Sequence, residues 1–240
     1  MRGLRIHHWL GVAAATALSL IAAVGLADAA EDSRESCADD AMIVFDASGS
    51  MSGNEKLGIA TTITRIDEVR AALGRVLPAA ARHRRVGLIT YGPGPYNQCN
   101  VELNLKPAPD AAKAIMRAVD ALTPAGKTPL TSAVAQAADV LDFRHKPGVV
   151  VVLTDGEETC GGSPCGLGKE LHDSAAHLVV HVIAFRTSNF SWTGEQSILG
   201  IKCLADANNG LYVTAESQED LVAAFQETLS CPMVSRAPVP

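Results

Sequence analysis

The sequence lacks most of the motifs that mark a catalytic or nucleic-acid-binding chain. It has no Gly-x-Gly-x-x-Gly or Walker loop to hold a nucleotide phosphate, and no Gly-x-Ser-x-Gly elbow to present a serine nucleophile. Basic clusters are scarce as well, since the short run Arg82–Arg85 is typical of a solvated turn between a helix and a strand. With a formal net charge of −6, the chain is therefore a poor candidate for nucleic-acid binding.

Long apolar runs are also missing, except at the amino terminus. Arg2 and Arg5 precede an apolar stretch from residue 9 to residue 26, and Ala27-Asp28-Ala29 fits a signal-peptidase site. This pattern predicts a secretory signal peptide over residues 1–29, with an uncleaved membrane anchor as the alternative. No second segment approaches the ~20 apolar residues that span a bilayer, so we expect no membrane span after cleavage.

The remaining sequence alternates between strand-like and helix-like segments. The run 149–153 is continuously apolar, as in a central parallel strand, whereas 101–105 alternates like a half-exposed antiparallel edge strand. The other expected strands cover 41–45, 86–91, 178–185 and 211–214, and the expected helices cover 64–81, 110–122, 129–143, a segment from 164, 195–207 and 218–229.

This alternation predicts one α/β domain over residues 41–230. We expect a doubly wound, Rossmann-like, mostly parallel six-stranded sheet with one antiparallel edge strand and helices on both faces. A lead-in over 30–40 would precede the domain, and a tail over 231–240 would follow it. In such sheets ligands bind beyond the carboxyl ends of the strands, at the point where the strand order reverses.

Five oxygen-bearing side chains are predicted to gather at that edge. Asp46, Ser48 and Ser50 follow the first strand, and Asp155 follows the most apolar one. Because 101–105 runs antiparallel, the next helix runs back up and brings Thr128 to the same edge. Carboxylate and hydroxyl oxygens suit a hard cation such as Mg²⁺ or Ca²⁺, and the absence of Cys and His from this set disfavours a soft metal.

Charge counting defines what such a site would do. Two carboxylates balance one divalent ion, and the hydroxyls are neutral, so the metal would stay electrophilic. Mg²⁺ takes about six oxygens and the chain offers about five, which leaves one position for an oxygen from another molecule, most favourably a carboxylate. An open position without an obvious general base favours binding over catalysis.

Each of these residues also has a simpler interpretation. Asp46 and Ser48 could cap the following turn, and Asp155 with Gly156 could form an ordinary turn. Thr128 before Pro129 is a good helix cap, and its hydroxyl cannot fully serve both roles. Two acids beside the site, Glu157 and Glu158, could tune the metal or repel an acidic partner, but solvated rim charges are the favoured interpretation.

The motif set resembles the von Willebrand factor type A family. The resemblance rests on Asp46-x-Ser48-x-Ser50, on Thr128 within Gly126–Leu130 and on Asp155 within Thr154-Asp155-Gly156, and it extends over residues 41–229. It implies a complete metal-ion-dependent adhesion site with direct bonds from the two serines and the threonine, and direct or water-mediated bonds from the aspartates. It also implies Mg²⁺, sometimes Ca²⁺ or Mn²⁺, and a protein partner that donates an Asp or Glu carboxylate. Polar residues inserted between 52 and 64 and the cysteine-bearing loop 155–165 depart from the family pattern.

Six cysteines in an exported chain predict disulfides, although sequence alone allows 15 pairings. The expected topology places Cys37 and Cys231 together at the bottom of the sheet, which favours that bridge. Cys160 could pair with Cys165, or one of the two could take Cys203, and Cys99 has no assigned partner. Zinc is disfavoured because Cys160-x4-Cys165 has no second pair at finger spacing.

The sequence therefore predicts a secreted or periplasmic, metal-dependent protein-binding module of the adhesion type, and not an enzyme. One alternative is a Mg²⁺-dependent hydrolase on a similar fold. The haloacid dehalogenase type of that chemistry needs Asp-x-Asp, whereas Ser48 stands at the second position here. Another alternative is a domain of the same fold that uses the metal only for structure.

Overall fold

The computed structural model describes residues 37, 39–56, 59–60, 62–187 and 194–231. The predicted signal peptide, most of the lead-in, and the tail after Cys231 lie outside the described residues. Within the described part of the chain, no helix is both long enough and apolar enough to cross a membrane.

A six-stranded sheet forms the centre of the domain, in the order β5-β4-β1-β6-β7-β8. All neighbouring strands are parallel except β4 and β5, which confirms the predicted antiparallel edge strand. The strand order reverses at β1, which lies between β4 and β6 because the chain adds strands first on one side and then on the other. The strands are β1 (Asp40–Asp46), β4 (Val86–Tyr91), β5 (Val101–Ala108), β6 (Pro147–Thr154), β7 (His177–Phe185) and β8 (Tyr212–Ala215).

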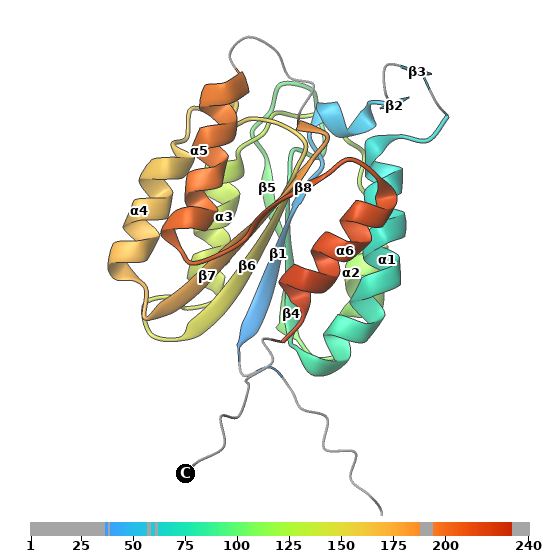
Figure 1. Ribbon diagram of the computed structural model, residues 1–240. Helices are drawn as coiled ribbons and strands as arrows, with labels where there is room; N and C mark the ends of the chain where they lie inside the picture. Colours follow the sequence, from blue (N-terminus) through green and yellow to red (C-terminus); the bar gives the residue numbers. More distant parts are fainter. Residues whose placement is uncertain (1–36, 38, 57–58, 61, 188–193, 232–240) are drawn as a thin grey trace, which may run out of the picture. The chain divides into compact units, whose positions relative to one another are not determined.

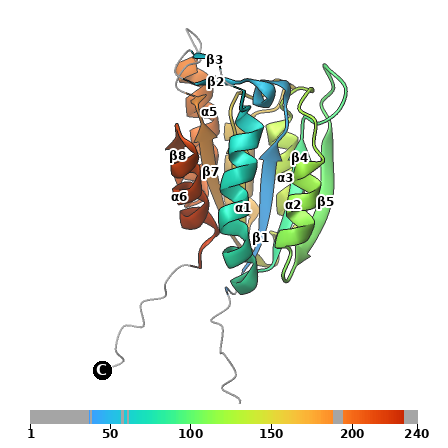
Figure 2. The same cartoon turned by 90° about the vertical axis from the view of Figure 1, so that its right-hand side faces the viewer.

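Helices cover both faces of this sheet (Figures 1 and 2). One face packs against α1 (Arg65–His83), α2 (Ala112–Asp120) and α6 (Gln218–Leu229). The other packs against α3 (Leu130–Val140), α4 (Pro164–Ser174) and α5 (Gly194–Ala207). Along β1, Ile43 and Phe45 enter the first core while Met42 and Val44 enter the second, because successive strand residues point to opposite faces. The strands β1 and β6 are therefore buried on both sides, as their continuous apolar runs predict.

Two short elements between β1 and α1 were not predicted. A 3-10 turn, η1 (Gly49–Ser52), follows β1, and a hairpin of β2 (Glu55–Lys56) and β3 (Ile59–Ala60) precedes α1. The hairpin accounts for the polar insertion between Ser52 and Thr64. The chain then enters α1 through a capping box, in which the Thr64 hydroxyl and the Asp67 carboxylate bond each other's backbone N–H groups.

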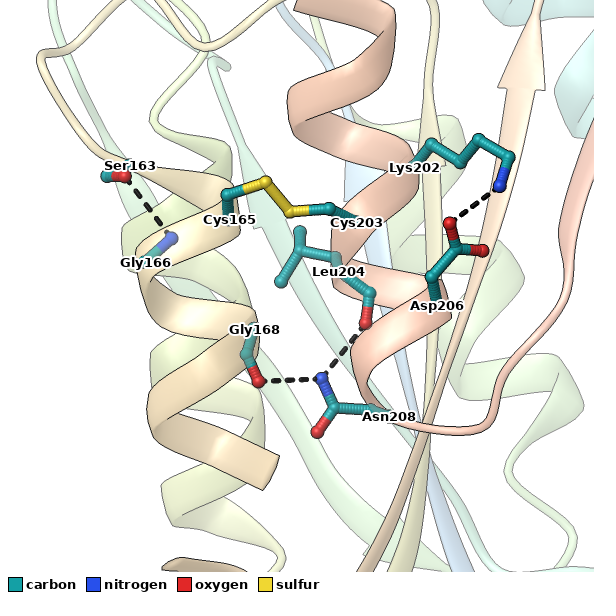
Figure 3. The surroundings of a disulfide bond; sticks show 9 residues. All are labelled: Ser163, Cys165, Gly166, Gly168, Lys202, Cys203, Leu204, Asp206 and Asn208. Carbon is teal, nitrogen blue, oxygen red and sulfur yellow. Dashed lines mark hydrogen bonds and ion pairs between the residues drawn. A yellow bond between two sulfur atoms is a disulfide. The ribbon is translucent and has the colours of Figure 1, made fainter. Parts of the chain in front are cut away.

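Two disulfides hold the lower and lateral parts of the domain. Cys37, ahead of β1, pairs with Cys231, after α6, and this confirms the favoured bridge. Cys165 on α4 pairs with Cys203 on α5, which selects one of the open alternatives and excludes a Cys160–Cys165 bridge (Figure 3). The helices approach closely at Gly168, where a Cβ would lie 3.2 Å from the Cys203 carbonyl oxygen.

Polar contacts complete these packing arrangements. The Asn208 side chain donates to the carbonyls of Gly168 and Leu204 at 3.0 and 2.9 Å, and so joins α4 to the end of α5 (Figure 3). On the other face, Arg186 after β7 binds both carboxylate oxygens of Glu68 on α1 at 2.9 and 2.7 Å. This pair is buried, so removing one partner would leave an uncompensated charge inside the protein.

Candidate functional site

The first predicted site residue, Asp46, ends the central strand β1. Asp46 lies opposite Tyr91 on β4, and the preceding residue, Phe45, lies opposite Leu153 on β6. The Asp46 side chain is fully buried. One carboxylate oxygen, Oδ1, accepts the Ser48 N–H at 2.8 Å, and the other, Oδ2, accepts the Tyr91 hydroxyl at 2.8 Å and the Thr154 hydroxyl at 3.0 Å. The carboxylate is thus held rigidly below the loops rather than extended into solvent.

Ser48, Ser50 and Asp155 form a continuous chain of oxygens above Asp46. The Ser48 and Ser50 hydroxyl oxygens are 3.0 Å apart, and Ser50 donates to Asp155 Oδ1 at 2.6 Å. Asp155, which directly follows β6, is as fully buried as Asp46. Its N–H points at Asp46 Oδ2 from 3.4 Å, so the ends of β1 and β6 are joined by the site residues themselves.

A backbone bridge brings the segment that contains Thr128 next to Ser48. Ser48 pairs with Gly126 in a short parallel bridge, and the Gly49 N–H donates to the Gly126 carbonyl at 2.9 Å. Gly92 makes this approach possible, because a Cβ there would lie 2.6 Å from Ser48 Cα and 2.7 Å from the Lys127 carbonyl oxygen. Gly92 also has a φ of +74°, which disfavours any other residue. The topology prediction for Thr128 is therefore confirmed.

The expected cap at the start of α3 was wrong by one residue. Pro129, not Thr128, is the cap position, and no side chain there bonds the first turn. Instead Glu158 Oε2 accepts the Thr131 N–H at 2.8 Å, and Glu158 Oε1 accepts the Cys160 N–H at 2.7 Å. Glu158 is thus a structural anchor and not a solvated rim charge. Because Glu158 bonds the first turn of α3, the Thr128 hydroxyl is not needed as the cap of this helix.

A third disulfide braces the same loops. Cys99, in the loop between β4 and β5, pairs with Cys160, in the loop after β6. Between them, Thr159 binds Thr128 in both directions: its hydroxyl accepts the Thr128 N–H at 2.8 Å, and its N–H donates to the Thr128 carbonyl at 3.0 Å. The backbone of Thr128 is therefore held by two hydrogen bonds to Thr159, which lies beside the disulfide that links the two loops.

These loops surround an open cleft of about 600 Å³. The Ser48, Ser50 and Thr128 side chains belong to its lining, whereas Asp46 and Asp155 are buried behind the serines. The remaining lining residues are Gly49, Ser52, Tyr96, Asn97, Pro124, Ala125, Gly126, Lys127 and Thr159. Residues that carry hydroxyl groups thus line the cleft, and two of them, Ser48 and Ser50, bond to the buried carboxylates.

Burial strongly affects the two carboxylates. Burial, together with the nearby charge of Asp155, raises the pKa of Asp46 to about 6, against the lowering effect of its hydrogen bonds. Burial also raises the pKa of Asp155, in opposition to the hydrogen bond from Ser50 and the charge of Arg65. Burial and mutual repulsion disfavour the ionised form of both acids, so a nearby positive charge would stabilise the pair.

Arg65 and Tyr91 are site residues that sequence reasoning missed. Arg65, the first residue of α1, donates from Nη1 to Asp155 Oδ2 at 2.8 Å. The signal for Tyr91 was present in the sequence, since a hydroxyl at the end of a buried strand needs a polar partner. For Arg65 no such signal existed, because a basic residue in the first turn of a helix is ordinarily solvated.

The donor set fits a hard divalent cation. Among the described residues, no three His, Cys, Asp or Glu side chains are grouped so that they could hold a metal ion, and the candidate set consists of two carboxylates and three hydroxyls. The Ser50 hydroxyl lies within hydrogen-bond distance of both the Ser48 hydroxyl and Asp155 Oδ1. Each of these oxygens can direct a lone pair toward one ion. All are hard oxygen ligands of the type that Mg²⁺ and Ca²⁺ use.

Comparison with known proteins relates this arrangement to one domain class. Residues 41–158, which hold all five site residues, match the family model for the von Willebrand factor type A domain. The uncharacterized protein YwmD of Bacillus subtilis (strain 168) is 33% identical over 108 residues, which are 44% of this chain and 46% of that protein. The chain spans about half the length of the curated relatives it matches.

Solved structures share the fold at low sequence identity. The von Willebrand factor type A structure from Catenulispora acidiphila has a TM-score of 0.58 at 17% identity, over 80% of this chain and 42% of that one. The corresponding domain of the type V pili tip protein Mfa5 from Porphyromonas gingivalis also has a TM-score of 0.58, at 13% identity, over 81% and 94%. The six-stranded sheet with one antiparallel edge strand is thus the fold of these domains.

The raised pKa of Asp46 predicts an unusual pH dependence for protein stripped of divalent ions. Between pH 3.8 and about 6, the folded chain holds a proton on Asp46 that the unfolded chain has lost. Asp46 alone should therefore lower the free energy of unfolding by roughly 3 kcal/mol as pH rises through this window. His181 acts in the opposite direction, because burial lowers its pKa to about 4 and the unfolded chain gains a proton there that the folded chain lacks. Urea denaturation at several pH values, on the wild type and on a variant without the Asp46 carboxylate, measures the Asp46 contribution as a difference.

The variant Asp46→Asn is the control for this prediction, because its side chain does not titrate, whereas His181 titrates in both proteins and cancels from the comparison. The stability of the wild type relative to Asp46→Asn should fall as pH rises from about 4 to about 6. Hydrogen bonds from Thr64 and Ser217 lower the pKa of Asp67 and Asp220, so these groups contribute only below about pH 4. A stability difference between the wild type and Asp46→Asn that stays constant or rises from pH 4.5 to 6.5 would contradict the prediction.

The brace around Thr128 predicts a local effect of the Cys99–Cys160 disulfide. In the double variant Cys99→Ser/Cys160→Ser, amide hydrogen exchange in residues 126–131 should become at least about tenfold faster, because the clamp on this loop opens more often. The double variant Cys165→Ser/Cys203→Ser removes a disulfide between α4 and α5 and should leave the loop protected. Mass spectrometry with a β6 peptide as internal reference measures both. Equal loop protection in the two variants would contradict the prediction.

Proposed function

We propose that this chain is an exported von Willebrand factor type A domain protein that binds Mg²⁺ and, through it, an acidic residue of a partner protein. The observation that carries the proposal is the cleft itself. Ser48, Ser50 and Thr128, from two different loops, line it, and the buried carboxylates of Asp46 and Asp155 bond to the two serines. Such a layout gives a cation strong charge compensation from below while leaving it accessible from the cleft.

The residues would have different roles according to their depth in the site. Ser48, Ser50 and Thr128 would hold the ion, and Asp155 would supply a carboxylate oxygen through Oδ1, beside Ser50. Asp46 would act from behind, because both of its oxygens already accept hydrogen bonds. A bound Mg²⁺ would supply a Lewis-acidic position that accepts an anionic oxygen from outside. Ca²⁺ and Mn²⁺ are alternative occupants of the same donor set.

The lining of the cleft supports binding rather than hydrolysis. Among the described residues that line it, none has a carboxylate or an imidazole that could serve as a general base. Asp46, the residue that a haloacid-dehalogenase-type mechanism would need as nucleophile, is buried and fully hydrogen-bonded instead. We therefore propose a non-enzymatic role.

The residues that line the cleft support the proposed partner, and the disulfides support the proposed location. Lys127 and the largely exposed Tyr96 also line the cleft, and a cationic and an aromatic side chain suit an acidic protein segment. Three disulfides favour an oxidising compartment, either the periplasm or the exterior of the cell. The fold likeness to the pili tip protein domain is in keeping with an adhesion or interaction role.

The proposed metal site predicts that either buried carboxylate is essential for Mg²⁺ binding. Calorimetric titration of Asp46→Ala and Asp155→Ala should show at least about a 100-fold weaker affinity than the wild type, because each variant removes half of the negative charge. The control is Asp173→Ala, which removes an exposed carboxylate on α4 that pairs only with Lys169. Unchanged Mg²⁺ affinity in both site variants would contradict the assignment.

Partner binding should require the metal and the hydroxyl shell. Immobilised wild-type domain should capture envelope proteins in Mg²⁺, release them in EDTA, and lose them to an excess of a glutamate-rich peptide. Thr128→Ala bait should capture none of these proteins, whereas Asp173→Ala bait should capture all of them. Partners that stay bound in EDTA would instead support a domain that uses the metal only for structure.

A further inference from the structure

Arg65 introduces a positive charge into the proposed metal site. Its guanidinium donates to Asp155 Oδ2 at 2.8 Å, while the other oxygen of the same carboxylate accepts from Ser50 at 2.6 Å. The Arg65 side chain is 12% exposed and that of Asp155 is fully buried. The guanidinium therefore approaches Asp155 on the side away from Ser50, where it can offset the carboxylate without entering the cleft lining.

The position of Arg65 in α1 is unfavourable for the helix itself. Arg65 is the first residue of α1, where the helix dipole favours acids, and Asp67 and Glu68 do occupy the same turn. Its guanidinium is also incompletely bonded, because Nε is buried and has no hydrogen-bond partner among the described residues. Neither helix stability nor hydrogen bonding explains a cation here, whereas the carboxylate of Asp155 does.

We propose that Arg65 is a tethered cation that weakens metal binding at Asp155 and stabilises the site when the metal is absent. This inference rests on the proposed function and specifies how the affinity of that site is set. The guanidinium neutralises part of the charge that would otherwise attract Mg²⁺, and it relieves the repulsion between two buried carboxylates in the metal-free chain.

Charge counting shows what Arg65 adds to partner choice. The two carboxylates alone would make a neutral site with Mg²⁺ bound, whereas the same site with Arg65 carries one net positive charge. Without the metal, the site carries one net negative charge instead of two. Arg65 thus makes the loaded cleft attract an acidic group and makes metal occupancy reverse the sign of the site, which couples partner binding to the ion.

The test compares two arginines of one helix. Arg65→Gln should bind Mg²⁺ at least about tenfold more tightly than the wild type in calorimetric titration, because a nearby positive charge is lost. In EDTA the same variant should melt at a lower temperature than the wild type. The control Arg75→Gln removes the same formal charge from an exposed arginine that pairs with Glu219, and both values should stay at the wild-type level. Arg65→Lys keeps the charge and should retain weak binding.

The outcomes separate this inference from the proposed function. If the wild type binds Mg²⁺ and Arg65→Gln binds it equally or more weakly, the inference fails alone. If neither protein binds Mg²⁺, both fail together. Should Arg65→Gln not fold, nitrogen-15 NMR of the wild type replaces it: added Mg²⁺ should move the Arg65 side-chain Nε signal and leave that of Arg75 in place. A stationary Arg65 signal on a Mg²⁺-saturated protein would overturn the inference.

Discussion

The site depends on two buried carboxylates placed next to each other at the carboxyl edge of the sheet. Asp46 and Asp155 end adjacent parallel strands, and neither has any exposed surface. Such a pair repels itself and lacks solvation, so it persists only if neighbouring groups supply compensation. Tyr91 and Thr154 donate to one carboxylate, and Ser50 and Arg65 donate to the other.

Several contacts fix the loops around these two acids. Gly92 allows the close approach of the Ser48 and Lys127 backbones, and Glu158 supplies the helix start that Thr128 would otherwise have to cap. The Cys99–Cys160 disulfide closes the outer side. The loops around the site are therefore fixed by contacts that do not involve the two carboxylates.

Much of the fold could be predicted from the sequence because local and global signals agree. The run 149–153 is apolar throughout and indeed lies in a strand buried on both faces, and the alternating run 101–105 lies at the antiparallel edge. The five candidate residues could be predicted to lie at one edge because parallel strands end there, which turns sequence order into spatial proximity.

The features that could not be predicted depend on tertiary contacts, which have no signal in the local sequence. Cys99 and Cys160 could be placed at the same edge, but their pairing depends on how two irregular loops curl. Arg65 resembles any basic residue near a helix start until the fold puts Asp155 beside it. Glu158 was interpreted as a rim charge because its two N–H partners, Thr131 and Cys160, lie in different segments. The error at Thr128 has the same origin.

The Cys37–Cys231 disulfide has a mechanical consequence. It joins the chain just before β1 to the chain just after α6, across 194 residues, at the end of the sheet away from the cleft. Tension applied through the flanking segments would pass from one sulfur to the other and bypass every strand and helix between them. A load carried by the flanking chain would therefore leave the geometry of the cleft undisturbed, and a pull on a bound partner would enter the domain at the opposite edge.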